Sequence, residues 1–242
     1  MHLRAGQAMD SSDQALAGKI AEVTLRRPSQ PDVWFDPGYV FRIQAEERLF
    51  LAALRRRGLT SLKGYKILDV GCGYGAWLRR YVEWGASVSD LHGVDILEER
   101  IVEARRRCPP GIDLQCRNAS RLDVADGSFD IISMSLVMSL IPDDAMRAAV
   151  GVELSRVLKP GGFILWYDFR YPPPRARGDM VAMTRRRIAN AFPAFELDLR
   201  SASAVPPITR RLAPYAGALC TLLDYISPLN THYVGTLIKR RP

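Results

Sequence analysis

Cysteine, histidine and long apolar runs are scarce in this sequence, and each scarcity excludes a class of protein. The four cysteines form no C-x-x-C pair and the three histidines are scattered, which argues against a structural zinc site and favours reduced, buried thiols. No apolar run approaches the roughly 20 residues of a membrane span, and residues 1–20 lack the apolar core of a secretory signal. There is no G-x-x-x-x-G-K-[ST] phosphate loop either. We therefore expect a cytoplasmic protein.

Positive charge is in excess, and nearly all of it is arginine. The 242 residues include 34 Lys and Arg against 26 Asp and Glu, a formal net charge of +8. The arginines cluster at 55–57, 105–107, 185–187 and 210–211. A basic balance fits a nucleic acid, an anionic membrane surface or an acidic substrate as partner, and it also fits solvated helix faces. Because the runs lie in separate predicted helices, the sequence does not join them into one patch.

Strand and helix patterns alternate along most of the chain. An apolar stripe at helical spacing over 39–58 precedes the first strand. The pattern then predicts strands at 65–71, 91–96, 112–119, 129–137, 161–169, 195–200 and 232–240, and helices at 75–85, 97–108, 143–158 and 178–192. This alternation predicts an α/β fold with a parallel sheet and helices on both faces.

The stretch "ILDVGCGYG" places glycines at 71, 73 and 75 directly after a strand that reads as buried. Glycine in a strand-to-helix turn costs backbone entropy, but it lets backbone amides approach a ligand. A tight turn that only packs the helix on the sheet is the alternative. Asp95 ends the next strand, twenty positions after Gly75. Its carboxylate is placed to accept hydrogen bonds from the hydroxyls of a ribose, or to cap the following helix.

The residues around the glycines narrow the choice of nucleoside. Dinucleotide folds usually carry G-x-G-x-x-G, whereas here Ala76 and Trp77 follow Gly75. Asp69, just before the turn, carries a negative charge that suits an ammonium better than a phosphate. A ligand with an adenosine end and an amino-acid end fits best, which points to S-adenosylmethionine.

Five motifs between Tyr65 and Gly162 resemble those of the class I S-adenosylmethionine-dependent methyltransferases, of the type 11-like group that acts on small molecules. "ILDVGCGYG" is similar to the first motif of that family, "GVDI" to the second, and "RNASRLDVADGSFDII" to the segment from the adenine pocket to the fourth strand. "LVMSLIPD" and "LKPGGFIL" resemble the signatures after strand four and before strand five. The resemblance covers under half of the chain and concerns the cofactor rather than the substrate. It implies a Rossmann-like, seven-stranded sheet whose last strand is antiparallel.

The resemblance also implies a role for individual residues. The main chain around Gly71 and Gly73 would hold the methionine moiety, and Asp69 would assist its ammonium. Asp95 would take the ribose, and an asparagine stands at 118 where an aspartate is commoner, although its oxygen can still accept a hydrogen bond from adenine. The full set of implied cofactor residues is Asp69, Gly71, Cys72, Gly73, Asp95, Ile96, Asn118, Ala119 and Met134.

Chemistry at the methyl group needs an aligned acceptor and, for a hydroxyl, a base. Asp168 ends the fifth strand and His232 opens the last one. By family strand order these strands are neighbours, so we expect Asp168 to orient His232 as the base; a purely structural pair is the alternative. Many relatives carry a His-His pair after strand four, where this chain has Met138, Ser139 and Leu140. We expect Met138 and Arg170 to contact substrate, and no metal.

Segments outside the motifs remain open to several interpretations. Residues 1–60 are expected to form an N-terminal helical lid, in which Tyr39 and Arg42 meet the substrate, and residues 61–242 the cofactor-binding domain. The helical insertion 206–228 has three interpretations: it covers the substrate pocket, it forms a homodimer contact, or it binds to a membrane surface. The sequence favours methyl transfer to a small molecule or sugar, such as a glycan or natural-product intermediate, on a hydroxyl oxygen. The alternatives are an RNA methyltransferase, which would need nucleic-acid binding, and a non-catalytic partner subunit that only binds the cofactor.

Overall fold

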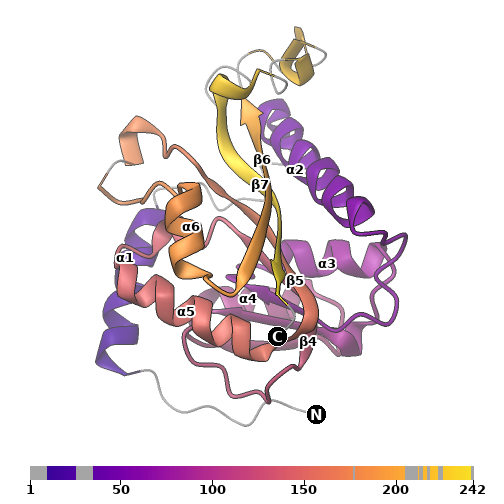
Figure 1. Ribbon diagram of the computed structural model, residues 1–242, viewed down its shortest axis with the longest axis vertical. Coiled ribbons are helices and arrows are strands. Elements are labelled where there is room, and N and C mark those ends of the chain that lie inside the picture. The colour runs from indigo at the N-terminus through magenta and orange to yellow at the C-terminus, as the bar shows by residue number, and fades with distance from the viewer. Residues whose placement is uncertain are drawn as a thin grey trace.

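A seven-stranded mixed sheet forms the centre of the computed structural model, which describes residues 10–25, 35–176, 178–204 and 226–240, together with 212, 215–216 and 219–222 (Figure 1). Its strand order is β3-β2-β1-β4-β5-β7-β6. The strands are β1 (Ile67–Val70), β2 (Leu91–Asp95), β3 (Asp113–Cys116), β4 (Phe129–Ser135), β5 (Leu158–Phe169), β6 (Phe195–Ala204) and β7 (Asn230–Lys239). Strand β7 runs antiparallel to both β5 and β6, while β1 to β5 pair in parallel. The predicted α/β class and the antiparallel last strand are confirmed.

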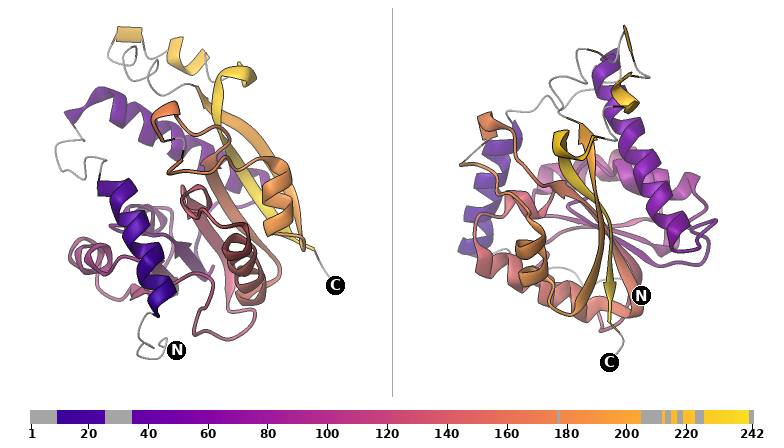
Figure 2. Two further views of the ribbon diagram at one scale, coloured as in Figure 1. Left: turned by 90° about the vertical axis from the view of Figure 1, so that its left-hand side faces the viewer. Right: turned by 45° about the horizontal axis from the view of Figure 1, so that its top comes forward.

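Helices cover both faces of the sheet, as the alternating pattern predicts (Figures 1 and 2). One face packs against α2 (Pro37–Arg56), α3 (Ala76–Glu83) and α4 (Glu98–Arg107), and the other against α5 (Asp144–Val157) and α6 (Arg185–Ala191). The remaining elements are α1 (Ser11–Leu25) and the short 3-10 turns η2 (Val88–Asp90), η3 (Met138–Leu140), η4 (Pro174–Ala176) and η5 (Ser227–Leu229). Two apolar clusters, one on each side of the sheet, make up the core.

Helix starts follow local capping chemistry. Asp36 accepts a hydrogen bond from the Tyr39 amide at 2.9 Å, and Pro37 occupies the first turn, so α2 begins before the predicted residue 39. The helix predicted at 178–192 begins only at Arg185. Thr184 caps it through the Arg187 amide at 3.2 Å, and the extended chain before it buries Met183 completely. Burial of methionine therefore outweighs helix propensity in that segment.

The structure describes helix α1 within the expected lid but only part of the expected insertion 206–228. Helix α1 forms where the sequence shows no clear periodicity, because Asp10 caps it by accepting from the Asp13 amide at 2.9 Å and because it packs on the rest of the molecule. Most of the predicted insertion 206–228 lies outside the described residues. Among the residues that are described, no helix combines the length and the apolar character needed to cross a bilayer.

Candidate functional site

The carboxyl ends of β1, β2 and β4 meet where the strand order reverses, which is where open α/β sheets bind ligands. The turn after β1 is fastened to β2 by hydrogen bonds. The Gly71 and Cys72 amides donate to the Val94 carbonyl at 2.8 and 3.0 Å, and the Gly73 amide donates to Asp95 Oδ2 at 3.0 Å. The predicted glycines and the predicted acid are therefore joined in one preorganised loop.

Two glycines of this loop need the left-handed backbone region, with φ of +68° at Gly71 and +53° at Gly73. A Cβ at Gly71 would lie 2.6 Å from a methyl of Val137, whereas a Cβ at Gly73 would meet nothing within 4 Å. Gly71 is thus required by packing. Gly73 borders open space, as expected where a ligand approaches the backbone.

Asp95 is buried and holds three neighbours. Besides the Gly73 amide, it accepts from the Leu97 amide at 3.0 Å and lies 3.7 Å from Arg100 Nη1. The Leu97 bond closes a turn just before α4, whose N-cap residue is Leu97 and has no side-chain cap hydrogen bond, so Asp95 does not cap that helix. The same carboxylate lines the cavity described next.

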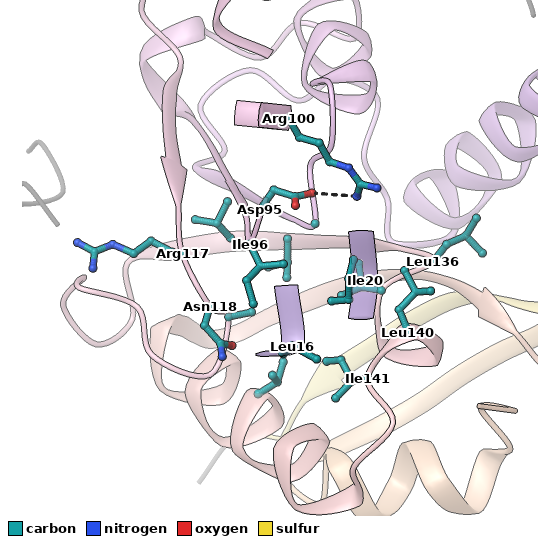
Figure 3. A pocket seen from close by; sticks show the side chains of 16 residues that line it. Leu16, Ile20, Asp95, Ile96, Arg100, Arg117, Asn118, Leu136, Leu140 and Ile141 are labelled. Carbon is teal, nitrogen blue, oxygen red and sulfur yellow. Dashed lines mark ion pairs between the residues drawn. The ribbon is translucent and has the colours of Figure 1, made fainter. Parts of the chain in front are cut away.

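A cavity of about 80 Å³ lies against these strand ends, and Figure 3 shows its walls. The predicted residues Gly71, Asp95, Ile96, Asn118 and Ala119 all line it. Sequence reasoning missed most of the remaining wall: Leu16, Ile20, Arg100, Arg117, Leu136, Val137, Leu140, Ile141 and Val150. The volume is below the roughly 300–1,000 Å³ of typical ligand pockets.

Helix α1 accounts for much of this closure. Leu16 and Ile20 project from it into the cavity (Figure 3), and Asn118 Nδ2 donates to Asp13 Oδ1 at 2.6 Å. Asp13 is itself only 6% exposed. The amide expected to read adenine is thus engaged by the N-terminal helix, which closes over that end of the site.

A second group of polar side chains lies beneath α2 at the other end of the loop. Asp69 is 2% exposed, and its Oδ2 has no hydrogen-bond partner. Burial, opposed by the hydrogen bond from Ser133 and assisted by the neighbouring carboxyls of Asp95 and Glu46, raises the pKa of Asp69 to about 8. Ser133 in turn accepts from the Tyr81 hydroxyl at 2.5 Å.

Glu46 of α2 belongs to the same group and was missed from sequence. It is 2% exposed, accepts from Ser135 Oγ at 2.6 Å and lies 3.5 Å from Arg42 Nη1. Burial raises its pKa, which Arg42 and Ser135 counter in part. A signal was available: Glu46 stands four residues before Phe50 and seven before Ala53, on the apolar stripe of its helix.

The segment after β4 is strained and tightly held. Leu136 has φ +57°, unusual for a residue with a side chain, and its amide donates to the Tyr167 carbonyl at 2.8 Å. Its side chain lines the cavity. Met134 and Met138, predicted to line cofactor and substrate, instead have 1% and 0% exposure within the core on the α5 side and are absent from the cavity wall.

The predicted contact between Asp168 and His232 is wrong. In the β5–β7 ladder, His232 stands opposite Phe169, and Asp168 opposite Tyr233. Since side chains alternate between the faces of a sheet, Asp168 and His232 point to opposite sides. The His232 ring packs on Tyr167 and Phe169, with ring centroids 4.6 and 4.2 Å away.

Each residue of that predicted pair has other neighbours. Asp168 accepts from the Ser139 and Phe169 amides at 3.0 and 2.7 Å, so it fixes the η3 turn beside the cavity. Burial raises the pKa of Asp168 to about 6 against these hydrogen bonds. His232 Nδ1 lies 2.9 Å from the Thr231 hydroxyl.

The predicted substrate residues Tyr39, Arg42 and Arg170 are each partly buried. The Arg42 guanidinium lies over the Tyr39 ring at 5.0 Å, and that of Arg170 over the Tyr171 and Tyr233 rings at 4.7 and 5.4 Å. None of the three lines the cavity. Across the described part of the chain, no group of three or more His, Cys, Asp or Glu side chains is arranged to hold a metal ion.

Known proteins resemble both the sequence and the fold of this chain. Residues 67–162 match the family model described as "Methyltransferase domain". The ubiquinone biosynthesis O-methyltransferase of Methylococcus capsulatus is 30% identical over 138 residues, which are 55% of this chain and 55% of that protein. The 2-methyl-6-phytyl-1,4-hydroquinone methyltransferase of Synechocystis is 34% identical over 46% of this chain and 35% of its own length. The matches thus span about half of these curated relatives or less.

Solved structures share the fold over a larger part of the chain. The N-methyltransferase NodS from Bradyrhizobium japonicum WM9, solved with S-adenosyl-L-homocysteine, superposes with a TM-score of 0.62 at 16% identity, covering 95% of this chain and 99% of NodS. An S-adenosylmethionine-dependent methyltransferase from Mesorhizobium loti gives 0.58 at 20% identity over 76% and 95%. At these identities the likeness concerns the fold.

Proposed function

Because the chain belongs to the class I S-adenosylmethionine-dependent methyltransferases, we propose that it transfers the cofactor's methyl group to a hydroxyl oxygen of a small molecule. The observation that carries the proposal is the fastened loop from Gly71 to Gly73 with Asp95 against it, at the reversal of strand order. The names of the quinone-pathway O-methyltransferases among the relatives support an oxygen acceptor.

The residues present fit this cofactor on two structural grounds. Asp69 Oδ2 is buried without a partner, which suits the cofactor's ammonium, and the face of Gly73 is open where a Cβ would otherwise project. When bound, S-adenosylmethionine supplies an electrophilic methyl group on a sulfonium. The chain's contribution is to bind and orient it: Asp95 for the ribose, Asn118 and Ile96 for adenine, Asp69 for the ammonium.

Entry of the cofactor requires α1 to yield. Leu16 and Ile20 form part of the wall of the small cavity, and Asp13 accepts a hydrogen bond from the Asn118 amide at 2.6 Å. We infer that α1 moves outward to admit the cofactor and then closes over the adenine end. This assigns the lid role expected for residues 1–60 to α1 in particular.

A hydroxyl acceptor must lose a proton, and His232 stays our proposed base, now without Asp168. The Thr231 hydroxyl beside Nδ1 replaces the aspartate as the group that orients the ring. His232→Gln should lower kcat about 10²- to 10⁴-fold with little change in cofactor affinity. A variant with unchanged kcat would show that His232 is not the base.

Titration calorimetry followed by a transfer assay tests the proposed function. The chain should bind both S-adenosylmethionine and S-adenosylhomocysteine, and should move a labelled methyl group to a member of a panel of catechols, hydroquinones and sugars. Label appearing in RNA, or cofactor binding without turnover on any acceptor, would support the nucleic-acid or the non-catalytic alternative instead. Absence of binding to either ligand would refute the assignment.

A further inference from the structure

Two buried carboxyl groups with little compensating charge lie where α2 packs on the sheet: Glu46 on α2 itself and Asp69 on β1. Glu46 and Asp69 are each 2% exposed, and Glu46 lies close enough to raise the pKa of Asp69 and of the buried Tyr81 hydroxyl. Among the described residues, the cation that lies against either carboxyl is Arg42, 3.5 Å from Glu46 Oε2 and itself partly exposed. Buried carboxyls in such a setting either keep a proton or need a bound cation to stabilise the ionised form.

The groups that face this pair come from every neighbouring element. Helix α2 contributes Arg42, α3 contributes Tyr81, and β4 contributes the hydroxyls of Ser133 and Ser135. From the loop and β2 come Cys72, whose thiol has a pKa raised by burial and by Asp69, and Asp95, which is paired with Arg100. His232 of β7 lies on the same face of the sheet as Asp69, and strands β4 and β5 separate β7 from β1.

We propose that Glu46 and Asp69 together form the binding site for the ammonium group of the cofactor, because both carboxyls are buried and Asp69 Oδ2 has no hydrogen-bond partner. The expected consequence is that binding of the cofactor releases a proton. The inference rests on the proposed function for its ligand and extends it by adding a residue from outside the family motifs. Glu46 is a binding residue in this account, and the proton goes to solvent.

The raised pKa values of both groups fix the sign of the effect. Below about pH 8 the free protein holds a proton on Asp69, whereas the ammonium favours the charged carboxylate. Cofactor affinity should therefore rise with pH, by up to about tenfold per unit below pH 8, and should stop rising near pH 8, where the carboxyl is already ionised and the amino group of the ligand begins to lose its own proton. The α-ammonium is present in both S-adenosylmethionine and S-adenosylhomocysteine, so both should show the same dependence.

Calorimetric titration of either ligand, in two buffers of different ionisation heat at pH 6 to 8.5, measures the number of protons released. The wild-type protein should release close to one proton at pH 7. Glu46→Gln, whose amide oxygen can still accept from Ser135, should release fewer protons and bind both ligands at least about fivefold more weakly. Glu47→Gln is the matched control, because Glu47 is the adjacent acid of α2 and pairs with Arg80 at 3.6 Å instead.

Ser135→Ala tests whether a mere loss of packing explains the result. It removes the hydrogen bond to Glu46 and leaves both carboxyls, so proton release should persist. Glu46→Gln with wild-type proton release would overturn the inference alone, as would a loss confined to S-adenosylmethionine, which would point to the sulfonium. A wild-type protein that binds neither ligand would overturn the proposed function first.

Discussion

Replacement of Asp69 by asparagine should stabilise the ligand-free protein increasingly as pH rises. Burial raises the pKa of Asp69 to about 8, from about 4 in an unfolded chain. Between these values the folded state holds a proton that the unfolded state has lost, so stability falls as pH rises, by about 1.4 kcal/mol per unit for this one group. Asparagine carries no such proton and removes the dependence.

The magnitude is large enough for a melting experiment. From pH 6 to pH 8 the difference in unfolding free energy between Asp69→Asn and wild type should grow in favour of the variant by about 2 kcal/mol, because the slope of about 1.4 kcal/mol per unit falls by half as the pH reaches the pKa. For a chain of this length that corresponds to a growth of about 4–8 °C in the difference between melting temperatures. Using the difference cancels the other titrating groups, including Asp168, whose pKa is raised to about 6.

Differential scanning fluorimetry at constant ionic strength, in overlapping buffers from pH 5.5 to 8.5, provides the measurement. Asp123→Asn serves as control, since Asp123 is exposed and its removal also deletes one carboxyl. The control difference should stay level across the range. A difference for Asp69→Asn that is equally level would show that Asp69 is already ionised in the fold, and the reasoning about an uncompensated buried carboxyl would fail.

Four further substitutions separate folding from ligand binding. Gly71→Ala should cost about 1–3 kcal/mol of stability by chemical denaturation, because the new methyl lies 2.6 Å from a packed valine. Gly73→Ala, with open space around it, should cost less stability yet weaken S-adenosylmethionine at least about tenfold by calorimetry; equal stability losses at both positions would contradict this. Asp95→Asn should weaken S-adenosylmethionine and its demethylated product alike by about 10- to 100-fold, and unchanged affinity would take the ribose role away from Asp95. Asp13→Ala should speed cofactor association in stopped-flow mixing by freeing α1, and an unchanged rate would mean that α1 does not gate entry.

The sheet and the cofactor end of the site were predictable because both depend on local patterns. Each strand of the parallel core is a short apolar run with a turn after it, and parallel strands bring their carboxyl ends to one edge. Gly71 follows β1, Asp95 ends β2 and Asn118 lies two residues after β3, so their meeting at one cavity follows from strand direction. Residue type and position in the chain were sufficient there.

The predicted contact between Asp168 and His232 was wrong because strand direction determines the edge of the sheet at which a residue lies but not the face to which its side chain points. Asp168 and His232 do lie at the expected edge, but a pairing register of Asp168 with Tyr233 turns the two side chains to opposite faces. A shift of one residue would have brought them together. Register depends on packing along the whole β5–β7 ladder, and no short motif encodes it.

Contacts made by the helices before β1 depend on tertiary structure in a different way. Asp13 of α1 and Glu46 of α2 reach the site from 105 and 89 residues away along the chain from their partners Asn118 and Ser135. For Asp13 the sequence offers no periodicity to read. Glu46 interrupts an apolar stripe, and a buried charge on such a stripe costs several kcal/mol unless something compensates it. Folding alone does not explain a charged residue at position 46, because glutamine would keep the hydrogen bond to Ser135 and carry no charge. The proposed binding of a cationic ligand at the neighbouring Asp69 would explain it.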